Sequence, residues 1–187
     1  MKCVLGLDIS SSVIGIAIIS GESEPEVILY TSSIDMRKID CEYKKCDIAR
    51  EALQKIKEKF EITDIFIEMA FKSFAGGKSS ADTVAKLTRT NGQMSLVVRD
   101  VFDIIPALLD VNISRKNLKI HTISEKKHPL KLSVKVQVFE WLKQQKIAEH
   151  VTFPINKKGT LDKNIAYDIS DAIVMALAGF QTLNSKV

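Results

Sequence analysis

Residues 3–20 read CVLGLDISSSVIGIAIIS, and this stretch decides which fold the rest of the chain can complete. Two apolar runs rich in β-branched residues lie on either side of a short serine turn. Apolar runs of this length bounded by turn residues are typical of buried strands, so the stretch predicts an antiparallel hairpin. Asp8 ends the first run, and an ionised carboxylate is rarely buried unless a partner or a ligand compensates its charge. The hairpin therefore raises the question of what Asp8 binds.

Length and composition limit the class of protein. The 187 residues fit one domain over residues 1–187, and 45% hydrophobic with 27% charged residues is typical of globular proteins. No apolar run reaches the roughly 20 residues that span a bilayer, and the N-terminus lacks the pattern of a signal peptide. Three cysteines are too few for a disulfide framework, and Cys41 and Cys46 lack the matching pair of a zinc site. We expect no membrane partner and a cytoplasmic location, or the DNA-containing compartment of a host cell or organelle.

Strand and helix patterns alternate along the rest of the chain. Strands are expected at 26–34, 64–68 and 107–111, and helices at 43–60, 81–102, 114–119, 134–145 and 164–183, with loops at 70–80 and 120–132. Three antiparallel strands followed by strands that alternate with helices predict an α/β fold, with a mixed five-stranded sheet flanked by helices.

Carboxylates recur at the ends of predicted buried elements. Glu68 ends the strand DIFIE, and Asp168 and Asp171 share one face of the last helix. Each has an ordinary structural explanation as a turn residue, a surface charge or a helix cap. Together, however, three separate segments bring acids to the edge of one core, where a divalent cation would relieve their repulsion.

The type of ligand indicates the metal and the reaction. Oxygen ligands favour Mg²⁺, with Mn²⁺ able to substitute, over zinc. Four carboxylates can hold two ions about 4 Å apart, the arrangement that serves in-line phosphoryl displacement. One ion would activate a water and the other would stabilise the leaving 3′ oxygen, so no small-molecule cofactor is expected.

Basic residues cluster in the segment before the last two helices. The net charge of +4 indicates nucleic-acid binding only weakly, so the distribution matters more. The basic cluster consists of Arg115, Lys116, Lys119, Lys126, Lys127, Lys131 and Lys135. Between residues 115 and 135 the sequence has one acidic residue, Glu125. Solvated surface lysines explain any one of these residues, but clusters beside candidate catalytic acids favour contacts to phosphates.

The hairpin with Asp8, the strand-ending Glu68 and the late Asp168/Asp171 pair resemble the RuvC family of Holliday-junction resolvases, within the RNase H-like superfamily. The resemblance covers nearly the whole chain, and its most telling stretch is EMAFKSFAGGKSSADTVAKLTRTNGQ, residues 68–93. It implies a single RNase H-like nuclease domain that depends on Mg²⁺. Such an enzyme would resolve four-way junctions by paired symmetric nicks, leaving 5′-phosphate and 3′-hydroxyl ends.

The resemblance also assigns residues to DNA binding. It implies that Phe71 stacks on or wedges between bases at the crossover, with Phe74 as its substitute, although Phe71 also fits the role of a loop anchor. It further implies that Lys119 and Lys135 contact phosphates near the scissile bond. The long loop 120–132 departs from the family pattern, so Lys131 could take the place of Lys135.

Members of the resembled family act as homodimers, since a two-fold symmetric junction presents two equivalent strands. The helix at 81–102 is the candidate interface, because its apolar face is wider than packing on one sheet requires. Gly92 would permit close approach of a second backbone. The residues of this face are Val84, Leu87, Met94, Val97, Val98 and Val101.

Other functions remain open on the sequence alone. A nuclease of the same superfamily with broader branched-DNA or RNA-processing activity would use the same acids. Residues 6–10 also match the G-x-D-x-S phosphate loop of actin-like and sugar-kinase ATPases, although two such lobes need well over 187 residues. A DNA-binding module with a degraded site is disfavoured because all four acids are present.

Overall fold

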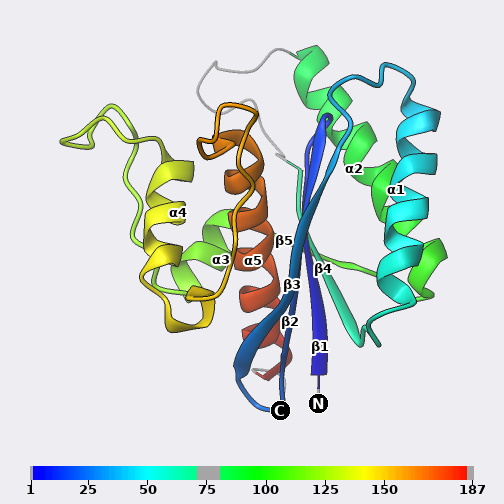
Figure 1. Ribbon diagram of the computed structural model, residues 1–187, viewed down its shortest axis with the longest axis horizontal. Coiled ribbons are helices and arrows are strands. Elements are labelled where there is room, and N and C mark those ends of the chain that lie inside the picture. The colour runs from blue at the N-terminus through cyan, green and yellow to red at the C-terminus, as the bar shows by residue number, and fades with distance from the viewer. Residues whose placement is uncertain (1, 71–80, 185–187) are drawn as a thin grey trace.

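A five-stranded mixed sheet forms the centre of the molecule, as the sequence predicts. The computed structural model describes residues 2–70 and 81–184 (Figure 1). The strands lie in the order β3-β2-β1-β4-β5, with β1, β2 and β3 antiparallel and with β4 and β5 parallel to β1. Their bounds are β1 Lys2–Ile9, β2 Val13–Gly21, β3 Pro25–Asp35, β4 Asp64–Glu68 and β5 Ala107–Leu109.

Helices cover both faces of this sheet. Figure 1 shows α1 and α2 on one side and α3, α4 and α5 on the other. The bounds are α1 Glu42–Lys57, α2 Ala81–Phe102, α3 Val111–Asn117, α4 Val134–Lys143 and α5 Lys163–Asn184, with a 3-10 turn, η1, at Lys146–Ala148. None of the helices within residues 2–70 and 81–184 combines the length and apolar character needed to cross a membrane.

The two faces of β1 belong to two different cores. Leu5 and Leu7 pack with residues of α1 and α2, whereas Val4 packs with residues of α5. Successive side chains of a strand point to opposite faces, so Asp8 lies on the α5 face together with Val4. Burial on both faces explains why the hairpin is almost continuously apolar.

The structure corrects the predicted boundary between the last strand and the helix that follows it. The strand predicted at 107–111 ends at Leu109, because the Asp110 side chain accepts hydrogen bonds from the backbone of Asn112 and Ile113 and caps α3. The helix predicted at 114–119 therefore begins at Val111.

The apolar face of α2 is also used differently from the prediction. Its residues Met94, Val97, Val98 and Val101 pack in the core of this chain against α1 and the sheet. The prediction that these four residues form a dimer interface is therefore wrong, since they are already buried.

Candidate metal centre

Strand pairing places two of the predicted acids next to each other. Asp8 is the penultimate residue of β1 and Glu68 is the last residue of β4. The parallel register pairs Leu7 with Ile67, so the following residue of each strand lies at the same end of the sheet. Both side chains are on the α5 face, because Phe66, two residues before Glu68, packs with α5.

Helix α5 brings the other two acids to the same edge by crossing the hairpin at very short range. A Cβ added at Gly15 would lie 2.1 Å from the carbonyl oxygen of Asp168, and one added at Gly6 would lie 2.2 Å from that of Ala172. Only glycine at these positions leaves room for the helix backbone. The glycines in the hairpin therefore set the height of Asp168 and Asp171 above the sheet.

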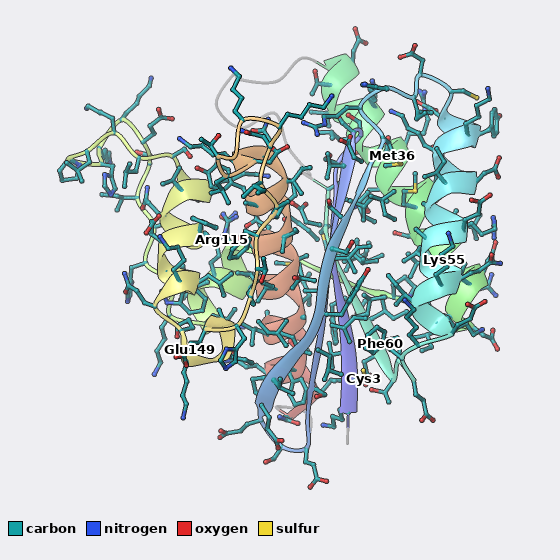
Figure 2. The ribbon with its side chains drawn as sticks, in the orientation of Figure 1. Cys3, Met36, Lys55, Phe60, Arg115 and Glu149 are labelled. Carbon is teal, nitrogen blue, oxygen red and sulfur yellow. The ribbon has the colours of Figure 1, made fainter. Side chains whose placement is uncertain are left out.

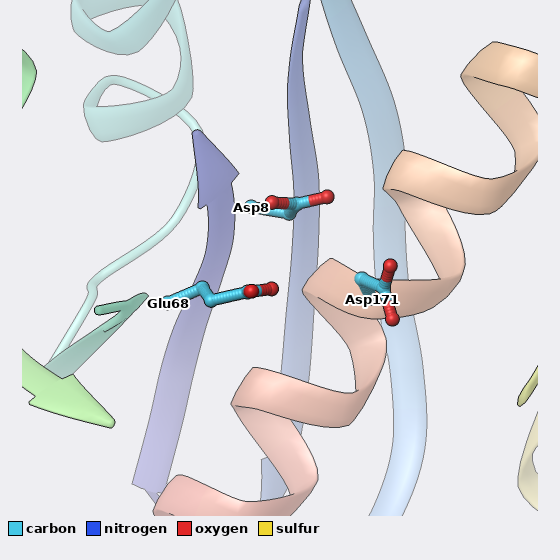
Figure 3. A group of neighbouring side chains, drawn as sticks. All are labelled: Asp8, Glu68 and Asp171. Carbon is cyan, nitrogen blue, oxygen red and sulfur yellow. The ribbon is translucent and has the colours of Figure 1, made fainter. Parts of the chain in front are cut away.

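Three of the four acids converge. Asp8, Glu68 and Asp171 each offer a carboxylate oxygen, and these oxygens lie within 4.8 Å of one another. Figure 3 shows the three side chains facing a common space between the strands and α5. Asp168 lies nearby on α5 but is not part of this group of three.

Two basic side chains compensate part of the negative charge. Arg115 of α3 donates a hydrogen bond of 2.9 Å to Oδ1 of Asp171, from the side of the sheet covered by α3, α4 and α5 (Figure 2). Lys135, in the first turn of α4, donates one of 2.7 Å to Oδ1 of Asp168. Its Nζ also lies 3.6 Å from Oδ2 of Asp171 and 3.8 Å from Oδ2 of Asp8.

Burial and mutual repulsion disfavour the ionised form of two of these acids. Burial raises the pKa of Asp8 well above its usual value, and the charges of Glu68 and Asp171 raise it further. Burial, followed by the charge of Asp171, raises the pKa of Glu68 to about 7. Burial lowers the pKa of Lys135, but Asp8 and the other nearby carboxylates outweigh burial, so its pKa is raised. A bound cation would relieve the repulsion between these closely spaced carboxylates, and an all-oxygen set of ligands suits Mg²⁺ or Mn²⁺.

The acids open onto a cleft of about 380 Å³. Asp8, Glu68 and Asp171 line it together with Arg115 and Lys135. The rest of the lining is mostly apolar and consists of Ile9, Met69, Ala70, Leu87, Val111 and Val134, with the polar Ser10 and Asn91. A cleft lined by both charged and apolar side chains can bind a charged ligand while limiting access of water.

The remaining predicted residues lie elsewhere. Lys119 is exposed at the exit of α3, with a positive φ of 57°. Lys131 is exposed in the loop 120–132, where its Nζ donates to the carbonyl oxygen of Lys126. Phe71 and Phe74 lie outside the described residues. The roles of these four residues remain predictions.

Sequence reasoning missed two residues that support the centre. Arg115 was one member of a basic cluster, and only the position of α3 against α5 shows that it is the one that reaches Asp171. Asn91 is buried in α2 and donates a hydrogen bond of 2.9 Å to the carbonyl oxygen of Glu68, which fixes the end of β4. A polar residue inside the apolar pattern of a predicted helix was the available signal.

Comparison with solved structures identifies the architecture. Thermus thermophilus RuvC aligns at 14% identity with a TM-score of 0.64, over 98% of this chain and 97% of that one. This chain has the RuvC fold. The T. thermophilus RuvC in complex with Holliday junction substrate aligns at 11% identity and a TM-score of 0.63, over 98% of this chain and 96% of that one.

The RuvC fold also extends to a eukaryotic structure. The yeast mitochondrial Holliday junction resolvase Ydc2 aligns at 13% identity and a TM-score of 0.58, over 99% of this chain and 81% of that one. The sequence itself matches no protein-family model and no curated protein. The fold is thus preserved at a level of identity where sequences no longer align reliably.

Proposed function

We propose that this protein is a divalent-metal-dependent DNA endonuclease that resolves four-way junctions. The observation that supports this proposal best is the convergence of Asp8, Glu68 and Asp171, whose carboxylate oxygens lie within 4.8 Å of one another in the lining of a cleft in a RuvC fold. One solved structure with this fold is a RuvC in complex with Holliday junction substrate.

Each side chain of the centre has a role in this proposal. Asp8, Glu68 and Asp171 would hold Mg²⁺, which when bound supplies the positive charge that in-line attack of water on a phosphodiester requires. Arg115 fixes the orientation of Asp171 through their hydrogen bond. Water would add to phosphorus as the bond to the 3′ oxygen breaks, giving 5′-phosphate and 3′-hydroxyl ends.

Residues around the centre would hold the DNA. Lys135 lines the cleft and is within reach of a phosphate that approaches the acids. Lys119 and Lys131 would contact phosphates further along, and Phe71, with Phe74 as substitute, would stack on bases at the crossover. A homodimer would carry two such centres, one for each of the two equivalent strands of a junction.

The test is cleavage of a synthetic four-way junction with Mg²⁺. We expect paired symmetric nicks from the wild type, and Mn²⁺ should also support them. Asp8→Asn, Glu68→Gln and Asp171→Asn should abolish cleavage but retain junction binding, because these carboxylates hold metal and not DNA. Asp100→Asn is the matched control, since Asp100 is an exposed acid of α2 paired with Arg50.

Comparison of substrates tests selectivity in the same assay. Faster cleavage of flaps, Y-forms or RNA–DNA hybrids than of junctions would favour a broader nuclease of this superfamily. Absence of cleavage on all of these substrates, or cleavage unchanged in the acid variants, would refute the proposal.

A further inference from the structure

The four acids of the centre are not equivalent in this structure. Asp8, Glu68 and Asp171 share a space in which one cation could contact all three. The carboxylate of Asp168 is instead engaged by the ammonium group of Lys135, at 2.7 Å. The same ammonium lies within 4 Å of carboxylate oxygens of Asp171 and Asp8. A positive charge of this chain therefore already occupies the space between Asp168 and the other acids.

The lysine is placed so that this contact can break without disturbing the fold. Its backbone is fixed at the start of α4, where the Ser133 hydroxyl accepts a hydrogen bond from the backbone N–H of Val136. Its side chain is 48% exposed, whereas the side chain of Asp168 is only 12% exposed. A lysine side chain is a compact charge on a flexible stem, so the ammonium can rotate toward solvent while the carboxylate stays in place.

Two cations cannot use the same small space. An ammonium ion and a divalent ion a few ångströms apart repel strongly in a partly buried site. The carboxylate of Asp168 is consequently a poor metal ligand as long as the ammonium group of Lys135 contacts it. A DNA phosphate that enters the cleft offers Lys135 another anionic partner, because Lys135 lines that cleft.

We propose that Lys135 acts as a built-in substitute for the second cation, holding Asp168 until a DNA phosphate draws the ammonium away and allows a metal ion to take its place. This inference rests on the proposed nuclease function. The DNA-free protein binds one divalent ion among Asp8, Glu68 and Asp171, and the second ion binds only with DNA. Because coupling between two ligands is reciprocal, DNA strengthens binding of the second ion and the second ion strengthens binding of DNA. The centre is thus completed only on substrate.

A simpler role for Lys135, contact with DNA alone, predicts a different result for metal binding. If the lysine only contacts DNA, and rests against the acids for lack of another partner, its removal weakens DNA binding but leaves the number of bound metal ions unchanged. Metal binding measured without DNA separates the two roles.

The experiment counts Mn²⁺ ions bound to the full chain without DNA, by calorimetry and by electron paramagnetic resonance. We expect one ion per chain for the wild type and two for Lys135→Met and Lys135→Gln, with spin coupling between the two ions. The second ion should bind at least about tenfold more tightly than to the wild type, as expected for removal of a neighbouring like charge. Lys143→Met, which removes an exposed lysine of the same helix that pairs with Glu140, should bind one ion as the wild type does.

Asp168→Asn combined with Lys135→Met should return the count to one, because the ligand that Lys135 covers is then missing. Two ions in the DNA-free wild type, or one ion in both Lys135 variants when circular dichroism shows them folded, would overturn this inference alone. A wild type that binds no Mn²⁺ would overturn it together with the metal centre of the proposed function.

Discussion

Arg115 forms the most deeply buried ion pair within residues 2–70 and 81–184. Its side chain is 12% exposed and pairs with the side chain of Asp171, which is 2% exposed. Its Nε is buried with no hydrogen-bond partner among the residues that the structure describes. Removing one partner of a buried pair leaves an uncompensated charge, which costs more than the pair contributes when intact.

Replacing Arg115 by Met should therefore lower the free energy of unfolding by about 3 kcal/mol at neutral pH. Arg50→Met is the matched control, because Arg50 pairs with Asp100 at 3.8 Å with both side chains about 40% exposed. Loss of such an exposed pair costs less than about 1 kcal/mol. Urea denaturation of the two variants measures the difference. Equal destabilisation of both would contradict the assigned role of Arg115.

Glu68 makes stability depend on pH in a predictable direction. Its ordinary pKa is 4.5, and burial with the charge of Asp171 raises it to about 7 in the folded protein. The folded state then holds its proton more tightly than the unfolded chain does, so this group contributes stability at low pH that is lost as pH rises from 4.5 to about 7. The pKa of Asp8 is raised for the same reason and acts in the same direction.

The metal-free protein should accordingly melt at a lower temperature at about pH 8 than at about pH 5, and Glu68→Gln should reduce this difference. Added Mg²⁺ should raise the melting temperature more at the higher pH, where the carboxylates are ionised and bind it. Calorimetric melting curves of both proteins across this range, with and without Mg²⁺, provide the test. If the melting temperature of Glu68→Gln changes with pH as that of the wild type does, Glu68 is not the source of the pH dependence.

The sequence predicts the strands of the sheet, but it does not predict how the helices pack across the sheet and against one another. The apolar runs around Asp8 and before Glu68 are long enough to define β1 and β4. Because side chains alternate between the two faces of a strand, the positions of Asp8 and Glu68 in these runs place both acids on one face of the sheet. The separation of Asp168 from the other acids depends on the angle and height at which α5 crosses the hairpin. That geometry comes from tertiary contacts, which no periodicity in residues 163–184 encodes. The contact of Arg115 with Asp171 likewise requires α3 to pack beside α5.

Gly15 is the part of that crossing that a single substitution can probe. Gly15→Ala should destabilise the protein by at least about 2 kcal/mol, because its Cβ would collide with the backbone of α5 and the helix would have to move. The same shift would displace Asp168 and Asp171, so cleavage should fall even where the variant is folded. Gly92→Ala is the control, since a Cβ at Gly92 meets no atom within 4 Å and alanine favours a helix by up to about 1 kcal/mol.

Thermal denaturation and junction cleavage measured side by side distinguish these effects. A Gly15→Ala variant with wild-type stability and activity would show that α5 does not depend on close approach to the hairpin. Loss of stability in Gly92→Ala would indicate that another backbone packs against this position.

Two-fold symmetry is the property of the whole molecule that the proposed reaction requires. Helix α2 uses Met94, Val97 and other apolar residues for its own core, so any interface on this helix must use its outer side. Leu96 is 55% exposed there, one turn after Gly92. Gly92 leaves room for a second helix to approach, and the exposed Leu96 offers that helix an apolar side chain to pack against. These two features favour the outer side of α2 as the contact between copies.

Leu96→Glu should therefore convert the proposed homodimer of the 20.9 kDa chain into a monomer, as measured by sedimentation equilibrium. Ile155→Glu is the control, because Ile155 is 70% exposed in the segment between η1 and α5 and its substitution should leave the dimer intact. The monomer keeps a complete centre, since Asp8, Glu68, Asp171 and Lys135 all come from one chain. It should still nick junctions but lose the coordination between strands, so singly nicked junctions accumulate. If the Leu96→Glu protein stays dimeric, the interface lies elsewhere than at Leu96 of α2. If it is a monomer that still makes paired nicks, symmetric cutting does not require a dimer.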